Sequence, residues 1–141
     1  MIFSSVESLT NRIVIAGDSA KLADMRRELY ELAGDNEVPV QATRRMVLAV
    51  DEAISNVIEH GLQGRVSEIE IIVEFVQDEV IVKIIDDGIP FDPRPCRNLP
   101  NRMGFPKRGF GLYLIQLIAD TVEYERTPSG KNVLTLTKRT E

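Results

Sequence analysis

The chain has only one cysteine, Cys96, among its 141 residues, and it has no tryptophan. A single cysteine excludes an internal disulfide, which fits a reducing compartment. Apolar packing can suffice, because a chain of this length buries about 68–70% of the surface exposed when it is unfolded. Its apolar runs are far shorter than a membrane span, and no basic region followed by an apolar run suggests a signal peptide. We therefore expect a single domain over residues 1–141, cytoplasmic and without a membrane anchor.

Positive charge is also scarce. Seventeen Lys and Arg residues face 22 Asp and Glu residues, for a net charge of −5. This balance argues against nucleic acid as a direct partner. One segment differs, because residues 92–108 contain five basic residues and one acid, a local charge of +4. This segment is either a solvated basic loop or a loop that meets an anion.

Hydrophobic periodicity predicts five strands and three helices. Prolines are concentrated between the third predicted strand and the third predicted helix, where residues 86–108 contain five of them. Long loops of this kind are often functional. Gly34 and Gly61 are expected to end the first two helices. The order predicts an α+β fold, a two-layer sandwich with helices on one face of a mixed β-sheet. The expected strands are 11–16, 69–75, 80–85, 121–126 and 132–138, and the expected helices are 18–33, 39–60 and 109–120.

The second predicted helix carries the first candidate motif. Glu52, Asn56 and His60 are spaced i, i+4 and i+8, so they form one stripe, roughly opposite the apolar face. Ala49 and Ala53 flank the stripe and leave room for a ligand. The Asn56 oxygen suits Mg²⁺, and Glu52 could polarise a hydroxyl or a water. Taken alone, the stripe is better explained as a solvated helix face.

The second candidate motif ends the third predicted strand, where apolar residues are followed by Asp86, Asp87 and Gly88. A carboxylate at a strand end can accept a hydrogen bond from an amino group such as that of adenine. Gly88 would let the backbone turn sharply and a flat ring come close. The competing interpretation is an ordinary Asp-Gly turn, which is frequent.

The third candidate motif begins the last predicted helix. Glycines before a helix expose backbone N–H groups, and together with the helix dipole and adjacent cations they form an anion site. The competing interpretation is a glycine hinge that opens a buried helix. The residues of this motif are Lys107, Arg108, Gly109, Phe110, Gly111 and Leu112.

The three motifs together provide what a purine triphosphate requires: a metal ligand, a base-reading carboxylate and a phosphate cradle. The chain has no Gly-x-x-x-x-Gly-Lys, which excludes a P-loop. Residues 48–61 resemble the N box of the ATPase superfamily shared by DNA gyrase, MutL and sensor histidine kinases. Residues 86–88 resemble its first glycine box, and residues 108–112 its second. The resemblance covers nearly the whole chain and implies the histidine-kinase-like, Bergerat-type ATPase fold.

The resemblance also implies roles for individual residues. Glu52 would be the catalytic base, and Asn56 would bind Mg²⁺. Asp86 would read the adenine amino group, and residues 92–108 would form the ATP lid. Pro90 stands where the family often has a second glycine, which stiffens this loop. The further ATP-binding candidates are His60, Gly88, Lys107, Arg108, Gly109, Phe110, Gly111, Leu112 and Asn132, the last at a position where the family often has Thr.

The length and the short lid are most similar to the stand-alone anti-sigma-factor kinases. The resemblance therefore implies an ATP-dependent serine/threonine-protein kinase that phosphorylates an antagonist protein and sequesters a sigma factor. Homodimers are common in that family. The alternative is a non-catalytic, ATP-dependent binding module that regulates its partner by sequestration, and Glu52 favours the enzyme because pure binding requires no base. A sensor histidine kinase is not expected, since His60 is the only histidine.

Overall fold

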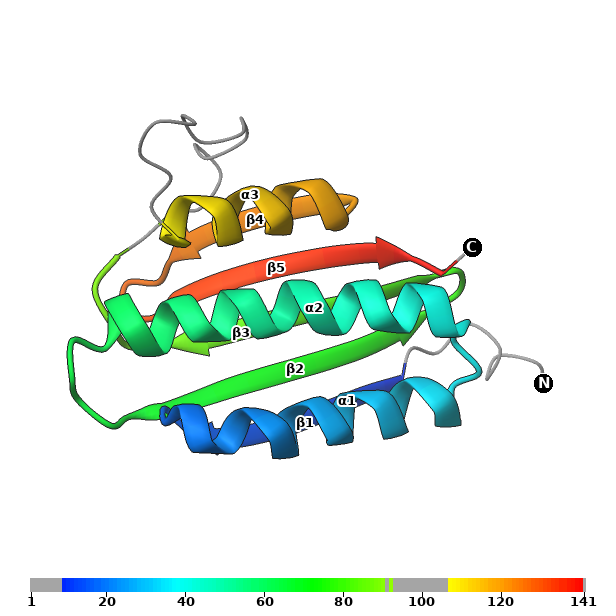
Figure 1. Ribbon diagram of the computed structural model, residues 1–141, viewed down its shortest axis with the longest axis horizontal. Helices are drawn as coiled ribbons and strands as arrows, with labels where there is room; N and C mark the ends of the chain where they lie inside the picture. Colours follow the sequence, from blue (N-terminus) through cyan, green and yellow to red (C-terminus); the bar gives the residue numbers. More distant parts are fainter. Residues whose placement is uncertain (1–8, 91, 93–106, 141) are drawn as a thin grey trace.

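The structure, a computed structural model, describes residues 9–90, 92 and 107–140. In this part of the chain, no helix is long and apolar enough to cross a membrane. Figure 1 shows the arrangement of the elements. In chain order they are β1 (Leu9–Ala16), the 3-10 turn η2 (Ser19–Lys21), α1 (Leu22–Asp35), α2 (Val40–Asn56), the π turn η3 (Val57–Gly61), β2 (Glu68–Val76), β3 (Glu79–Asp86), α3 (Lys107–Ile118), β4 (Thr121–Arg126) and β5 (Asn132–Arg139).

The fold has two layers, with α1, α2 and α3 packed on one face of a five-stranded sheet (Figure 1). This confirms the α+β sandwich, but the expectation of a mixed sheet is wrong. The strand order is β1-β2-β3-β5-β4, and every neighbouring pair is antiparallel. Two helices connect β1 to β2, so the chain returns in the opposite direction. The single helix α3 makes β4 parallel to β3, but β5 pairs between them.

The hydrophobic core lies between the sheet and the helices. Successive strand side chains point to opposite faces, so alternate apolar residues of β2 and β3 meet the helices. Ile71 and Val82 from the strands, and Val50 and Ile54 from α2, are at most 1% exposed. Burying one such side chain stabilises the fold by about 1.5–3 kcal/mol. Packing of these side chains sets the distance between α2 and the sheet, including the ends of β3 and β5.

The first helix runs further than the sequence suggests. The Asp18 side chain caps η2, and α1 then continues to residue 35. Gly34 remains helical, so the expectation that it stops the helix is wrong. Asn36 ends the helix instead, because its side chain and its backbone N–H both bond the carbonyl of Leu32. The chain then turns away at Glu37, whose φ is 57°.

The second helix was expected to be α-helical as far as His60. It changes instead to a π turn after Asn56. The N–H of Leu62 donates to the carbonyl of Val57 at 2.8 Å, an i→i+5 bond. The wider π turn means that side chains four positions apart beyond Asn56 no longer lie above one another. Short π segments inside or at the end of α-helices often mark functional sites.

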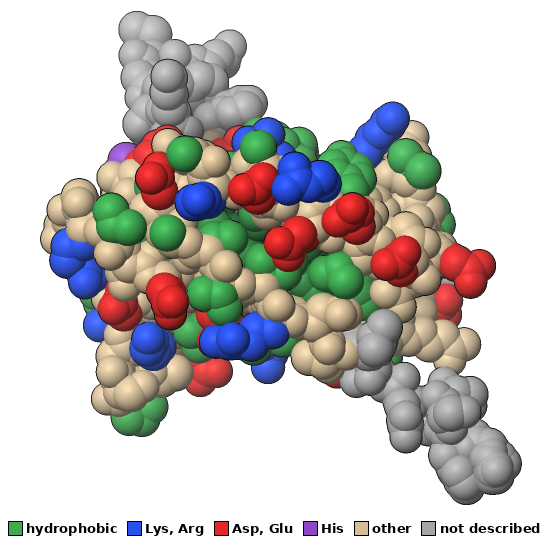
Figure 2. Space-filling model, turned by 90° about the horizontal axis from the view of Figure 1, so that it is seen from below, with side chains coloured by type: hydrophobic (Ala, Val, Ile, Leu, Met, Phe, Trp, Pro, Cys, Tyr) green, Lys and Arg blue, Asp and Glu red, His purple; other side chains and the backbone are tan. Residues whose placement is uncertain are grey.

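The surface over α1 and β1 is seen in Figure 2. Acidic and basic side chains are interspersed there, with hydrophobic side chains between them. Ion pairs also join α1 to α2, through Arg26 and Asp51 at 3.1 Å, and β1 to β2, through Arg12 and Glu70. Exposed pairs of this kind are worth about 0–1 kcal/mol each. This face therefore presents mixed charge and not a basic patch.

Candidate functional site

The site begins with the register of the sheet. Side chains on opposed residues of antiparallel strands lie about 4.5–5.5 Å apart, so each row across β3, β5 and β4 forms a contiguous group. Two neighbouring rows face the helices near the end of β3, a polar row at the edge and an apolar row behind it. The polar row is Asp86, Asn132 and Arg126, and the apolar row is Ile84, Leu134 and Tyr124.

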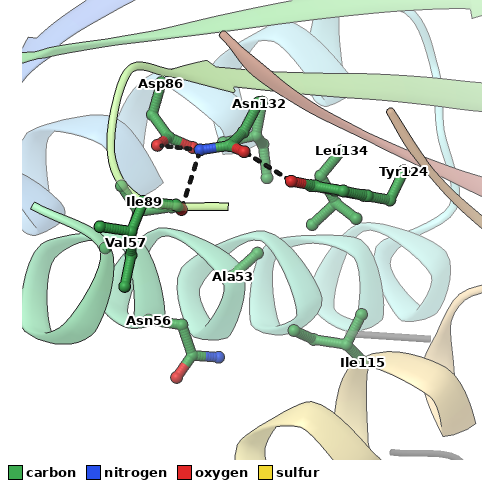
Figure 3. Close-up of a pocket in the computed structure, with 11 residues that line it drawn as sticks. Ala53, Asn56, Val57, Asp86, Ile89, Ile115, Tyr124, Asn132 and Leu134 are labelled. Carbon is green, nitrogen blue, oxygen red and sulfur yellow. Dashed lines mark hydrogen bonds between the residues drawn. The ribbon is translucent and has the colours of Figure 1, made fainter. Parts of the chain in front are cut away.

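Two residues of the polar row are buried, and the row is bonded within itself. Asp86 and Asn132 are each 5% exposed. The N–H of Gly88 donates to Asp86 Oδ1 at 2.8 Å, and Asn132 Nδ2 donates to the same oxygen at 3.0 Å. A buried carboxylate needs such partners, since burial without them is costly. Figure 3 shows the Asn132 amide between Asp86 on one side and Tyr124 on the other.

A cavity opens between these rows and the helices α2 and α3. Its empty volume is about 480 Å³, part of which is open to solvent. Sites for small molecules commonly have apolar walls and a few polar groups that fix orientation, and this cavity has both. The lining residues are Ala53, Asn56, Val57, Gly61, Ile84, Asp86, Ile89, Ile115, Tyr124, Asn132 and Leu134.

Asn56 lines the cavity and is only 9% exposed. The sequence instead predicted that Asn56 lies on a polar stripe roughly opposite the apolar face of the helix. In Figure 3 its carboxamide points away from the Asp86–Asn132 pair, on the side of α2 where α3 lies. Its Nδ2 atom is buried and has no hydrogen-bond partner in the part of the chain that is described. Buried amides are usually hydrogen-bonded, so within the described residues this carboxamide is a candidate to bind a ligand.

Glu52 lies one turn before Asn56, against the start of α3. A Cβ atom added to Gly111 would stand 2.6 Å from Glu52 Oε2, so the glycine makes room for the carboxylate. Burial raises the pKa of Glu52, and the charges of Asp51 and Glu59 raise it further. A raised pKa moves a carboxylate toward the range in which it can accept and release protons near neutral pH.

Gly88 is required for a reason other than the one expected. It does not have a positive φ. Its Cβ position is occupied, because an added Cβ would stand 2.6 Å from the carbonyl oxygen of Gly61 in η3. The next residue, Ile89, donates its N–H to that same carbonyl at 3.0 Å. The loop after β3 is therefore packed directly on the backbone of the π turn.

Several candidates fall outside this cluster. His60 lies in η3 but does not line the cavity; its side chain is 34% exposed, and its Nε2 is 3.7 Å from Glu59 Oε2. The backbone of residues 107–112 forms the first half of α3, but the side chains of Lys107, Arg108, Phe110 and Leu112 lie outside the described residues, as does the structure of Gly109 beyond its place in the helix. Of the expected lid over 92–108, residues 93–106 are likewise outside them.

The sequence interpretation missed several residues of the site, including Tyr124, Arg126 and Gly61. Tyr124 and Arg126 on β4 reach Asn132, and the hairpin turn over 127–130 would have predicted their register. The N–H of Thr127 donates to the carbonyl of Lys131 at 2.8 Å, which closes that turn. Gly61, by contrast, was assigned only a helix-ending role. No local signal shows that its carbonyl would meet residues 88 and 89.

A divalent metal fits this site only together with a ligand that brings its own oxygens. The described residues contain no group of three or more His, Cys, Asp and Glu side chains that could hold a metal ion. Mg²⁺ is commonly held by one or two protein oxygens, several waters and phosphates. The uncommitted carboxamide of Asn56 meets that requirement, because rotating the amide places its oxygen where Nδ2 now lies.

Known proteins of similar sequence are protein kinases by name. Serine-protein kinase RsbW of Bacillus cereus (strain AH187) is 30% identical over 88 residues, which are 55% of this chain and 53% of that protein. The RsbW of Bacillus thuringiensis (strain Al Hakam) is 28% identical over the same length. The match thus spans about half the length of these relatives.

Solved structures of similar fold have low sequence identity. The RsbU and RsbW domains of Rv1364c from Mycobacterium tuberculosis align with a TM-score of 0.69 and 20% identity, covering 93% of this chain and 32% of that one. The SiaB–SiaC complex from Pseudomonas aeruginosa aligns with a TM-score of 0.55 and 11% identity, covering 89% of this chain and 88% of that one. The histidine kinase domain of the Erythrobacter litoralis EL346 blue-light activated histidine kinase gives 0.56 and 17%, covering 86% and 60%.

The family model of the histidine kinase-like ATPase domain matches residues 15–138, a range that contains the whole cavity and every strand except most of β1 and the last residue of β5. The helix with Glu52 and Asn56, the buried Asp86 and the glycines 88 and 111 thus lie inside one match. This chain therefore belongs to the family of histidine kinase-like ATPase domains.

Proposed function

We propose that the protein is a serine/threonine-protein kinase of the anti-sigma-factor type, which uses Mg-ATP to phosphorylate an antagonist protein and sequesters a sigma factor in a partner-switching system. Family membership supports ATP binding. The serine-protein kinase name of the Bacillus relatives supports phosphoryl transfer to a protein. A structural relative solved as a complex, SiaB–SiaC, supports a protein partner.

The observation that carries this proposal is the position of Glu52 against Gly111. A helix start offers N–H groups and a positive dipole end to phosphates, so the start of α3 would hold the triphosphate. Glu52 lies at that helix with a raised pKa. It would accept the proton of a serine or threonine hydroxyl while that oxygen bonds to the γ-phosphorus and ADP leaves. Positioning and charge neutralisation supply most of the catalysis in such transfers.

The adenine ring and the Mg²⁺ ion would be held by other residues of the cavity. Both hydrogen bonds of the Asp86 carboxylate within the described residues end on Oδ1, which leaves Oδ2 to accept from the adenine amino group. Ile84, Ile115 and Leu134 would contact the flat ring. Asn56 would ligate Mg²⁺, which when bound neutralises charge on the phosphates.

Phosphate transfer by wild type and Glu52→Gln tests the proposal. The acceptor is the antagonist protein recovered by ATP-dependent pull-down from the source organism, with the phosphosite mapped by mass spectrometry. General-base contributions are about 10²–10⁴-fold, so transfer by Glu52→Gln should fall by that order. ATP affinity, measured by calorimetry, should change little because glutamine is similar in size and polarity.

Glu31→Gln is the control, because Glu31 is exposed on α1, lies outside the cavity and is not among the charges that raise the pKa of Glu52. Its transfer rate should stay within severalfold of wild type. Undiminished transfer by Glu52→Gln would remove Glu52 from the mechanism. Wild type that binds ATP but phosphorylates no pulled-down protein would instead support a sequestering module without catalysis.

A further inference from the structure

The Asn132 side chain, expected from sequence to contact ATP, is fully engaged within the protein. Its Nδ2 atom lies 3.0 Å from Asp86 Oδ1, 3.1 Å from the carbonyl of Gly88 and 3.2 Å from the carbonyl of Ile89. An amide nitrogen has two hydrogens, and here three acceptors share them. One buried side chain on β5 therefore holds both the base-reading carboxylate and the loop that follows it.

The oxygen of this amide bonds the neighbouring strand, so the amide is held at both ends. Arg126 Nη1 donates to Asn132 Oδ1 at 3.1 Å, and the Tyr124 hydroxyl lies 2.6 Å from the same oxygen. A guanidinium can only donate, so the atom facing Arg126 must be the amide oxygen. The nitrogen consequently faces Asp86. Arg126 Nη1 also donates to the carbonyl of Gly88 at 2.8 Å, so β4 holds the loop directly as well.

We propose that Asn132 is a positioning residue for adenine selectivity, and that Arg126 and Tyr124 set its orientation. The network presents Asp86 Oδ2 to the 6-amino group of the purine and fixes the loop of residues 88 and 89 beside it. Selectivity is then determined by a row of side chains across three strands, one of which, Arg126, does not line the cavity. This inference rests on the proposed ATP site.

Weakening this network should affect the contact with the purine amino group more than the contacts with the rest of the nucleotide. Arg126→Gln removes the guanidinium that donates to both Asn132 Oδ1 and the carbonyl of Gly88, so the amide that bonds Asp86 and the loop beside it are held less firmly. Asp86 would then shift, and its bond to the purine amino group would weaken. Contacts to the phosphates, on α2 and α3, lie outside the network and should persist.

The test compares the affinities of Mg-ATP and of purine riboside triphosphate, which lacks the 6-amino group, by calorimetry. In wild type the ratio should favour ATP by about tenfold, the value of one hydrogen bond to a charged group. In Arg126→Gln the ratio should fall at least threefold toward one. Asn132→Asp, which loses the donor, should do the same. Tyr124→Phe removes only a hydroxyl and is the most conservative variant. It is used for the test if Arg126→Gln and Asn132→Asp do not fold.

Arg139→Gln is the matched control, since Arg139 lies at the opposite end of β5 and pairs with Asp120. It should lower stability without altering the affinity ratio. An unchanged ratio in all three network variants would reduce the network to a structural role, and a wild-type ratio of one would also overturn the inference. Wild type that binds neither nucleotide would overturn the proposed ATP site itself, which is a separable outcome.

Discussion

The environment of the Glu52 carboxylate opposes its ionisation and so affects the stability of the fold. Burial and two neighbouring acids raise its pKa above the ordinary value of 4.5. An acid with a raised folded-state pKa destabilises the fold when it is ionised. This effect develops as the pH rises from the unfolded pKa through the folded one. The same environment that prepares the carboxylate to take a proton therefore weakens the native state at neutral pH.

Glu52→Gln is accordingly expected to raise the free energy of unfolding at pH 7. The gain should shrink as the pH is lowered and vanish below about pH 4.5, where the unfolded wild-type carboxyl is also protonated. Urea unfolding of both proteins across this range measures the difference. A variant that is less stable than wild type at pH 7 would show that the carboxylate makes a favourable contact, which would contradict a site poised for catalysis.

At the scale of elements, the critical contact joins the loop after β3 to η3. A Cβ atom at residue 88 would meet the backbone carbonyl of Gly61 at 2.6 Å, and backbone cannot move as a flexible side chain does. Gly88→Ala should therefore destabilise the fold by about 1–3 kcal/mol, the usual effect of overpacking. It should also separate the loop from the π turn and so weaken ATP binding.

Gly34→Ala provides the contrast. Gly34 lies in α1 with no atom within 4 Å of its Cβ position, and its φ is not positive. Alanine there should stabilise the protein by about 0.5–1 kcal/mol. Chemical denaturation of Gly88→Ala, Gly34→Ala and wild type measures whether each substitution lowers or raises the free energy of unfolding. Equal effects of the two substitutions would mean that the contact between residues 88 and 61 is not close in solution.

At the scale of the whole molecule, nucleotide binding should stabilise the fold, because the cavity is formed by α2, α3 and three strands that meet only in the native state. A ligand at one hundred times its Kd adds about 2.7 kcal/mol to the free energy of unfolding. Mg-ATP should do so in wild type, and chelating the metal with EDTA should remove much of the gain. Urea titrations with and without ATP measure it.

Asn56→Ala tests whether the metal acts through the predicted ligand. With that variant, the stabilisation by ATP should be smaller and nearly insensitive to EDTA. Gln41→Ala, an exposed change at the start of the same helix, should behave as wild type. Equal sensitivity to EDTA in wild type and Asn56→Ala would exclude Asn56 as the metal ligand.

Local patterns in the sequence were enough to predict most elements and the three motifs. Helix and strand periodicity depends on neighbouring residues, and Glu52, Asn56 and Asp86 are recognisable from their immediate spacing. The same locality explains the errors. The end of α1 depends on how Asn36 caps it, and the π turn depends on the contacts of Gly61 with a loop far along the chain.

Only the tertiary structure decided which groups meet. Asn132 bonds a carboxylate 46 positions away, and Gly111 admits the Glu52 side chain from another helix. Such contacts follow from strand order and register, which place residues side by side regardless of their separation in sequence. The residue types of the site could thus be read from the chain, whereas the division between Asp86, which is proposed to contact adenine, and Asn132, which bonds Asp86 within the protein, arises from the pairing of β3, β5 and β4.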